Sequence, residues 1–254
     1  MSAELLRVAP RHESRHSCPL CPAGPHCLTA DGTPAERIAW HDLQQQWISL
    51  PRAGKSLYAL GDAATAVYVV RAGCLKTYTV DGDGHERVRN FFFPGDIVGL
   101  DALGSAAYPS HALSVSASQV CRITKGDLQR VLHAAPGVMQ RLLERTSAEL
   151  CRSLALSGDY SADQRVAAFL LSMQRRLSAT ADADDFDLPM TRRDIANHLR
   201  LATETVCRVL TRFVDAGWLD TADRHVRIRH REALGAQAEP VGLSPQRRAV
   251  RLAA

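Results

Sequence analysis

Residues 191–214, TRRDIANHLRLATETVCRVLTRFV, decide the fold class of the C-terminal part of this 254-residue chain. Thr191 and Asp194 have the spacing of a capping box and predict the start of a short helix. Residues 200–202 make a short turn, and a second helix follows from Thr203. Two short helices joined by such a turn are typical of a helix-turn-helix.

The second of these helices has one apolar face and one polar, cationic face. We expect its inward side chains to be Val206, Val209, Leu210 and Phe213. The outer side chains of its first turns would enter a DNA major groove first, where Arg can bind guanine and Glu can bind cytosine. The expected base-reading residues are Thr203, Glu204, Cys207 and Arg208. The expected phosphate contacts are Thr191, Arg192, Arg193, Thr205 and Arg212.

Further along, Trp218-Leu219 and the alternating residues 226–229 predict a β-hairpin beside the helices, which makes a winged helix. The charge of this region agrees with a nucleic-acid partner, because residues 191–232 hold nine Arg against six acidic residues. The whole chain carries a formal charge of only +4, which would not establish that partner by itself.

Three cysteines stand close together near the N-terminus, in the stretch CPLCPAGPHC of residues 18–27. The segment has Pro and Gly and no apolar period, so the thiols are predicted to be ligands rather than core. A disulfide framework is disfavoured, because the total of seven cysteines is odd and no export leader is visible. Zinc is possible, with His16 and His26 as further donors. An iron–sulfur cluster would need a fourth thiolate from elsewhere in the chain.

Between these two regions the sequence predicts a short helix over residues 35–46 and then a β-roll. Residues 48–123 consist of short apolar runs separated by turns such as Asp81-Gly82, the pattern of an antiparallel barrel or jelly roll. The expected strands are Ser56–Leu60, Ala66–Arg71, Cys74–Val80, Glu86–Phe93, Ile97–Leu100, His111–Ser116 and Gln119–Ile123.

A helical period follows the roll. After a short amphipathic segment, a long helix is expected from Pro136 through Ser157. Its apolar stripe could pack on the roll of its own chain or on the same helix of a second chain, and we favour the second arrangement. A further helix is expected from a capping box at Ser161 and Gln164, followed by a polar loop over residues 178–187.

Other function classes find little support in the sequence. We expect no enzyme, because neither a Ser/His/Asp order nor an H-E-x-x-H or phosphate-loop motif is visible, although a small metallohydrolase built on the N-terminal thiols is a conceivable alternative. No apolar run approaches the length that spans a bilayer, so we expect no membrane partner and a cytoplasmic location.

Together these features resemble the Crp/Fnr family of bacterial transcription regulators, over essentially residues 18–232. The resemblance is to the oxygen-responsive Fnr branch, and it rests on the spacing of the N-terminal thiols, on a separate Cys121, and on Glu204-x-x-Cys207-Arg208. It implies that Cys18, Cys21, Cys27 and Cys121 bind a 4Fe–4S cluster. It also implies a homodimer that binds an inverted repeat in double-stranded DNA at low oxygen, acts as an activator through RNA polymerase, and separates when oxygen degrades the cluster.

The implied fold class is α+β, with a β-roll sensor domain of the cyclic-nucleotide-binding type, a long dimerisation helix and a C-terminal winged helix-turn-helix. The expected parts are an N-terminal ligand segment (residues 1–34), the roll (35–126), the dimerisation helix (127–158), the winged helix (159–232) and a disordered tail (233–254).

Two departures from the family pattern bear on function. Cys207 stands where Fnr proteins generally have Ser, so the preferred half-site TTGAT is expected to be relaxed or altered at one base pair. Residues 91–121 contain neither Arg nor Lys to hold a cyclic phosphate, so we expect no cyclic nucleotide. A regulator of this type that responds through zinc, thiol redox or haem instead of a cluster is the alternative.

Overall fold

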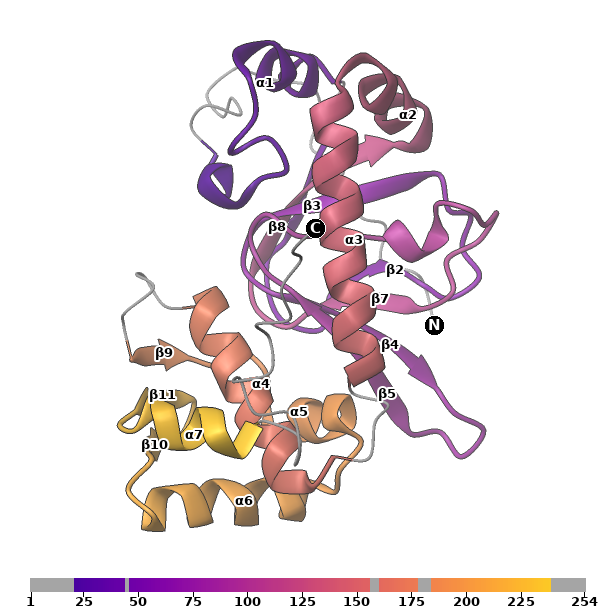
Figure 1. Cartoon of the computed structure of the whole chain (residues 1–254). Helices are drawn as coiled ribbons and strands as arrows, with labels where there is room; N and C mark the ends of the chain where they lie inside the picture. The colour runs from indigo at the N-terminus through magenta and orange to yellow at the C-terminus, as the bar shows by residue number, and fades with distance from the viewer. Residues whose placement is uncertain (1–20, 44–45, 156–159, 178–183, 239–254) are drawn as a thin grey trace, which may run out of the picture. The chain divides into compact units, whose positions relative to one another are not determined.

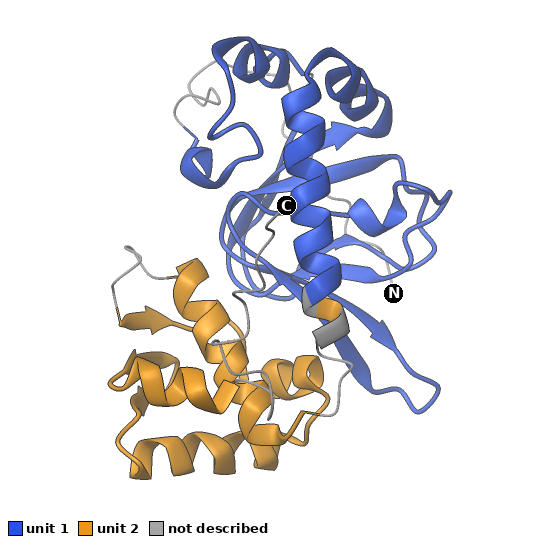
Figure 2. Cartoon of the chain, in the orientation of Figure 1, with its two compact units in different colours: residues 1–151 blue, residues 152–254 orange. Residues whose placement is uncertain are grey.

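The computed structural model of the chain describes residues 21–43, 46–155, 160–177 and 184–238. The chain divides into two compact units, residues 1–151 and residues 152–254, which are blue and orange in Figure 2. The first unit is rich in β-structure, and the second contains the helix-turn-helix.

The first unit is built on a β-roll (Figure 1). Its strands within the described residues are β1 (Gln46–Leu50), β2 (Ser56–Tyr58), β3 (Ala66–Ala72), β4 (Leu75–Val80), β5 (Glu86–Phe92), β6 (Ile97–Val98), β7 (His111–Ser114) and β8 (Ser118–Thr124). They form two antiparallel sheets with the orders β1-β8-β3-β6 and β2-β7-β4-β5. One apolar cluster draws buried residues from both sheets and fills the space between them. The predicted β-roll is confirmed.

The sheet that contains β8 has two faces with different surroundings. Trp47 and Val69 are the register partners of Cys121 on either side, and all three belong to an apolar cluster shared with the helices. Ile48 and Val120 lie one residue away on their strands and belong to the cluster inside the roll. Because successive side chains of a strand point to opposite faces, Cys121 points away from the interior and toward the helices.

Three helices cover that outer face. They are α1 (Pro34–His41), α2 (Lys125–Ala134) and α3 (Pro136–Ala155), and Figure 1 shows α3 running along the roll with α1 and α2 near its first turns. The expected long helix does begin at Pro136, and its Val138 and Leu142 are buried in the apolar cluster of the outer face. A capping box between Thr33 and Glu36 fixes the start of α1.

The second unit is a winged helix. Its helices are α4 (Ala162–Leu177), α5 (Arg192–Leu199), α6 (Thr203–Asp215) and α7 (Arg231–Ala238), and its strands are β9 (Asp185–Asp187), β10 (Leu219–Ala222) and β11 (His225–Ile228). The predicted capping box before α4 is confirmed, because the Gln164 N–H donates to the Ser161 hydroxyl at 3.2 Å and the Ser161 N–H donates to the Gln164 side chain at 2.8 Å. The hairpin of β10 and β11 is the predicted wing.

Two elements of the second unit were not predicted. The loop expected over residues 178–187 ends in β9, which pairs with β11, because Phe186 lies between two exposed Asp residues and is buried in the alternation of a strand. The disordered tail expected from residue 233 is wrong for residues 233–238, because α7 buries Leu234 and packs against α4. The rest of the expected tail, residues 239–254, lies outside the described residues.

The first unit also needs one correction. The helix expected over residues 35–46 ends at His41, and Gln46, its expected last residue, begins β1 instead. Strand pairing of residues 46–50 with β8 outweighs the roughly helical spacing of Ile38, Leu43 and Trp47. The expected end of the long helix at Ser157 lies outside the described residues.

Within the described part of the chain, no helix is both long and apolar enough to cross a membrane.

Gly95 sets how closely the thiol segment approaches the roll. It has a φ of 93°, and a Cβ at this position would lie 2.2 Å from the main-chain oxygen of His26. Gly84 is a matched control, because its φ is 83° and a Cβ there would meet nothing within 4 Å. We predict that Gly84→Ala costs only the left-handed backbone strain, about 1–2 kcal/mol, whereas Gly95→Ala costs measurably more in denaturant unfolding. Equal losses would show that the contact between Gly95 and His26 does not constrain the loop.

Candidate nucleic-acid interface and thiol site

The second helix of the motif, α6, has the two faces that its sequence predicts. Val206, Val209, Leu210 and Phe213 are buried. The side chains of Thr203, Glu204, Cys207, Arg208 and Arg212 are exposed, and Thr205 is half-buried. Arg208 keeps 64% of its side-chain surface exposed, and its guanidinium lies 3.5 Å from the Glu204 carboxylate. Such an exposed pair is weak, so both groups can exchange it for other hydrogen bonds.

The turn before α6 is held by the backbone. Arg200 adopts a left-handed conformation with a φ of 56°, and the N–H of Leu201 donates to the carbonyl of Ala196 at 2.9 Å. Arg165 on α4 donates to the carbonyl of Leu199 at 3.1 Å, which ties the end of α5 to the preceding helix. The turn between α5 and α6 is therefore held by hydrogen bonds to main-chain carbonyls at the end of α5.

The residues expected to contact phosphates differ in their exposure and in the hydrogen bonds that they already make within the fold. Arg193 is exposed. The Arg192 guanidinium donates to the carbonyl of Asp223 in the wing turn at 2.9 Å, and burial lowers the pKa of Arg192. Arg212 forms an ion pair with Asp163 at the start of α4. The Thr191 hydroxyl closes the capping box of α5, where it accepts from the N–H of Asp194.

The thiol segment is described only in part, because Cys18 lies outside the described residues. Cys21 and Cys27 are half-buried and flank a turn of 3-10 helix, η2 (Gly24–His26). Cys27 packs against the apolar cluster of the outer face, to which Cys121 belongs. Cys121 is only 6% exposed. The fold thus brings the N-terminal segment and the end of the roll to one apolar face.

The described thiols do not yet form a compact ligand set. Within the described ranges, only Asp81, Asp83 and His85 place three metal-binding atoms within 4.8 Å of one another. That group lies in the exposed turn between β4 and β5, and Asp81 accepts the N–H groups of Asp83 and His85 at 3.2 and 2.9 Å. These hydrogen bonds show that Asp81 stabilises the turn. The sulfur atoms of Cys21, Cys27 and Cys121 do not lie within 4.8 Å of one another as a group.

Two arginines of α3 hold the backbone of the thiol segment. The Arg145 guanidinium donates to the carbonyls of His26 at 2.9 Å, Cys27 at 3.0 Å and Gly95 at 3.0 Å. Arg141, one turn earlier, donates to the carbonyl of Leu28 at 2.7 Å. The segment around Cys27 is therefore fastened to both α3 and the turn at Gly95.

Arg141 also reaches the start of α1. Its guanidinium lies 3.0 Å from the Glu36 carboxylate, which accepts the N–H of Thr33 in the capping box at 2.8 Å. The Thr33 N–H and the Arg141 guanidinium hold the pKa of the Glu36 carboxyl below its usual range. In the sequence, Arg141 and Arg145 are four residues apart beside the apolar stripe, so they are expected on one face of the helix. Exposed, solvated arginines have the same spacing, so the sequence does not predict their contacts with the thiol segment.

The remaining cysteines lie apart from this segment. Cys74 is buried in the roll, whereas Cys151 is exposed on α3. Cys207 is exposed on α6, among the predicted base-reading residues.

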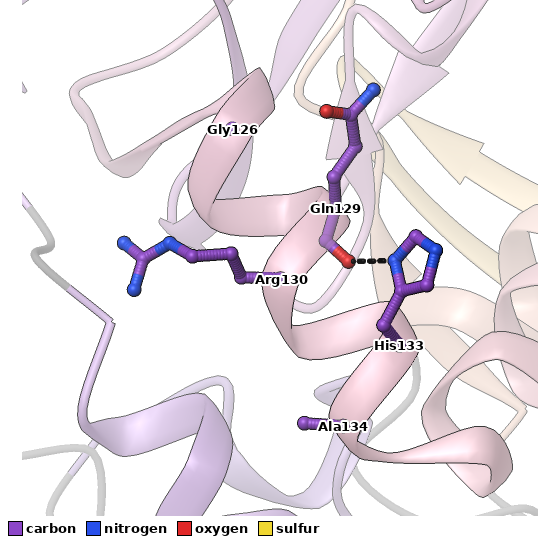
Figure 3. Close-up of a pocket in the computed structure, with 5 residues that line it drawn as sticks. All are labelled: Gly126, Gln129, Arg130, His133 and Ala134. Atoms are coloured by element: carbon purple, nitrogen blue, oxygen red, sulfur yellow. Dashed lines mark hydrogen bonds between the residues drawn. The ribbon is translucent and has the colours of Figure 1, made fainter.

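A shallow pocket of about 540 Å³ lies over α2, and all the residues that line it come from that one helix (Figure 3). The His133 ring contacts the main-chain oxygen of Gln129 at 2.7 Å, and the Arg130 side chain points away from both. None of the predicted site residues lines this pocket.

Comparisons with known proteins agree with this architecture. Residues 51–135 match the cyclic nucleotide-binding domain, and residues 164–237 match the Crp-like helix-turn-helix domain. The transcriptional regulatory protein btr of Bordetella pertussis is 36% identical over 229 residues, which cover 88% of this chain and 94% of that protein. The fumarate and nitrate reduction regulatory protein of Escherichia coli K12 is 34% identical over 185 residues, which cover 71% of this chain and 74% of that one.

Among solved structures, FixK2 of Bradyrhizobium japonicum superimposes with a TM-score of 0.70 at 29% identity, covering 78% of this chain and 99% of that chain. The predicted family and fold class are thereby confirmed, including the winged helix that presents α6. The chain belongs to the Crp/Fnr family of DNA-binding transcription regulators.

Proposed function

We propose that this regulator senses oxygen through a labile 4Fe–4S cluster held by Cys18, Cys21, Cys27 and Cys121, and that it binds an inverted repeat as a dimer when oxygen is low. The observation that carries the proposal is that Cys27 and Cys121, far apart in the sequence, both border the apolar cluster of the outer face. Thiolates are the usual ligands of such clusters, and limited solvent access favours their retention. The donor set therefore fits the group in chemistry.

The described thiols must move closer together to share a cluster, and this movement would change the hydrogen bonds that Arg145 makes to the segment. Cys21 and Cys27 lie on either side of η2, a short turn rich in Gly and Pro, whereas Cys121 is fixed in the middle of a paired strand. Binding would then draw Cys21 and Cys27 toward Cys121. Cluster assembly would therefore change the conformation of the N-terminal segment more than that of β8.

Movement of that segment would reach α3 through Arg145 and Arg141. Their hydrogen bonds end on main-chain carbonyls at His26, Cys27 and Leu28, so a change in the path of the backbone there alters the contacts of the helix directly. Cluster assembly can bias α3 only by as much as it favours one arrangement of these contacts over another.

The opposite side of α3 supports a dimer. Leu143 and Leu150 are 62% and 59% exposed, although they lie on a helix whose Val138 and Leu142 are buried. Their spacing of seven residues corresponds to two helical turns, the repeat of a two-helix seam. A second copy of α3 would bury both leucines and would present α6 twice, as an inverted repeat requires.

We propose that Arg208 and Glu204 read bases together with Thr203 and Cys207, since these side chains are exposed at the first turns of α6. We propose Arg193, whose side chain is exposed, as a phosphate contact. Thr191, Arg192, Thr205 and Arg212 would add phosphate contacts after exchanging or extending the bonds that some of them now make. RNA polymerase is the proposed protein partner, and the exposed turn between β4 and β5 is a candidate surface for it.

We also infer that the roll binds no cyclic nucleotide. Residues 91–121 lack a cation for the cyclic phosphate. Side chains occupy the interior instead: Tyr58 stacks on Tyr108 with ring centroids 3.8 Å apart, and Tyr68 lies 5.9 Å from Tyr58. The roll would then serve as a frame for the thiol site.

The cluster is tested by single replacements of its ligands. Cys21→Ala and Cys121→Ala should each lose iron and acid-labile sulfide and should bind DNA weakly without oxygen, because either change removes one of four thiolates. Cys74→Ala is the control, since Cys74 is buried like Cys121 but does not belong to the apolar cluster of the outer face. Normal iron content in either ligand variant would contradict the assignment. Zinc in the wild-type protein in place of iron would support a regulator of the same family with another signal.

The DNA contacts are tested by two arginines that are both exposed. Arg208→Ala should weaken binding to the specific site by about 1–3 kcal/mol and leave nonspecific binding nearly unchanged, because a base contact is lost. Arg193→Ala should weaken both kinds of binding and lower the salt dependence by about one phosphate contact. Titrations of a palindromic and a scrambled duplex over a range of salt would measure this, and equal losses for Arg208→Ala would make Arg208 a phosphate contact.

A further inference from the structure

One buried cation of the roll, Arg71, has no counter-charge among the residues that the structure describes. Arg71 is only 4% exposed, at an irregularity in the pairing of β3 with β8. Its Nε and Nη1 atoms are buried without a hydrogen-bond partner, and within the described residues it forms no ion pair. Burying a guanidinium without an anion is costly, so a position of this kind calls for a ligand.

The Arg71 side chain lies on the face that carries the thiols. Its guanidinium carbon is 3.8 Å from the ring centroid of Trp47, which belongs to β1. In the sheet, β8 lies between β3 and β1, so the side chain crosses β8 to reach that ring. Cys121 is the β8 residue paired with Trp47, and it points to the same face.

The contact with Trp47 does not satisfy the guanidinium. A cation–π contact uses the flat face of the group and compensates part of its charge. The N–H bonds lie in the plane of the group and point past the ring, and those of Nε and Nη1 are the unpartnered ones. Anionic atoms are the strongest acceptors for these N–H groups.

We infer that Arg71 is a positioning residue that supplies positive charge and N–H donors to the anionic, thiolate-ligated centre at Cys121 and Cys27. The inference rests on the proposed function, because four thiolates around a 4Fe–4S core leave a net negative charge. Hydrogen bonds to sulfur and nearby charge are among the features that tune such clusters. A cation beside the centre disfavours the loss of an electron to oxygen, so Arg71 would slow the decay of the cluster in air.

The test compares Arg71→Met with Arg71→Lys and with Arg122→Met, all purified without oxygen. Arg122 follows Cys121 directly in the sequence, and its guanidinium bonds instead to Gln46 and Thr65. After mixing with air-saturated buffer, the visible absorbance and the acid-labile sulfide of Arg71→Met should decay about tenfold faster than those of the wild type, a factor that corresponds to about 1.4 kcal/mol. Arg71→Lys should lie nearer the wild type than Arg71→Met does, and Arg122→Met should match the wild type.

A second readout uses the cluster-free proteins. There Arg71→Met should melt no lower than the wild type, because the change removes a buried charge without a partner. A clearly lower melting temperature would show that the charge is already compensated and would overturn the inference. Equal cluster decay in Arg71→Met and the wild type would overturn it too, while leaving the cluster in place. A wild-type protein without iron would instead overturn the proposed function, and the inference with it.

Discussion

In the first unit, the position of the thiol segment depends on the hydrogen bonds from Arg145 to main-chain carbonyls. One guanidinium joins the thiol segment at His26 and Cys27, the turn at Gly95, and the helix α3 that carries it. Since the acceptors are backbone atoms, the segment cannot shift past the helix without breaking these bonds. Gly95 contributes by leaving space, because any side chain there would collide with the His26 carbonyl.

This constraint gives α3 two distinct sides. One side faces the thiol segment and the roll, with Arg141 and Arg145 on carbonyls and Val138 and Leu142 in the apolar cluster. The other side leaves Leu143 and Leu150 exposed. A helix is stiff over this length, so a change in the contacts of the first side moves the second as a body. In the proposed function, this is the route by which a change at the thiols would alter the association of two chains.

Much of this could be predicted from the sequence, because the relevant signals are local. The capping boxes at Thr191 and Ser161 and the turns of the roll are read from a few neighbouring residues. Elements that depend on a partner far away in the sequence are harder to predict. β9 is too short to predict without its partner β11, and α7 is amphipathic only weakly until α4 covers Leu234.

The thiol site shows the same division between local and long-range signals. The spacing of Cys18, Cys21 and Cys27 predicts that they are ligands, and the family resemblance adds Cys121 to that prediction. The roles of Arg145 and Arg71 could not be predicted, because an arginine that binds distant carbonyls or crosses a neighbouring strand looks in the sequence like any solvated charge.

The most direct test of the account is to purify the wild-type protein without oxygen, measure iron, acid-labile sulfide and molecular mass, and repeat all three after exposure to air. The account predicts about four irons per chain, as expected for a cluster with four thiolate ligands, with a dimer that becomes a monomer as the visible absorbance fades. A colourless protein without iron, or a dimer that persists unchanged after the cluster has been lost, would contradict it.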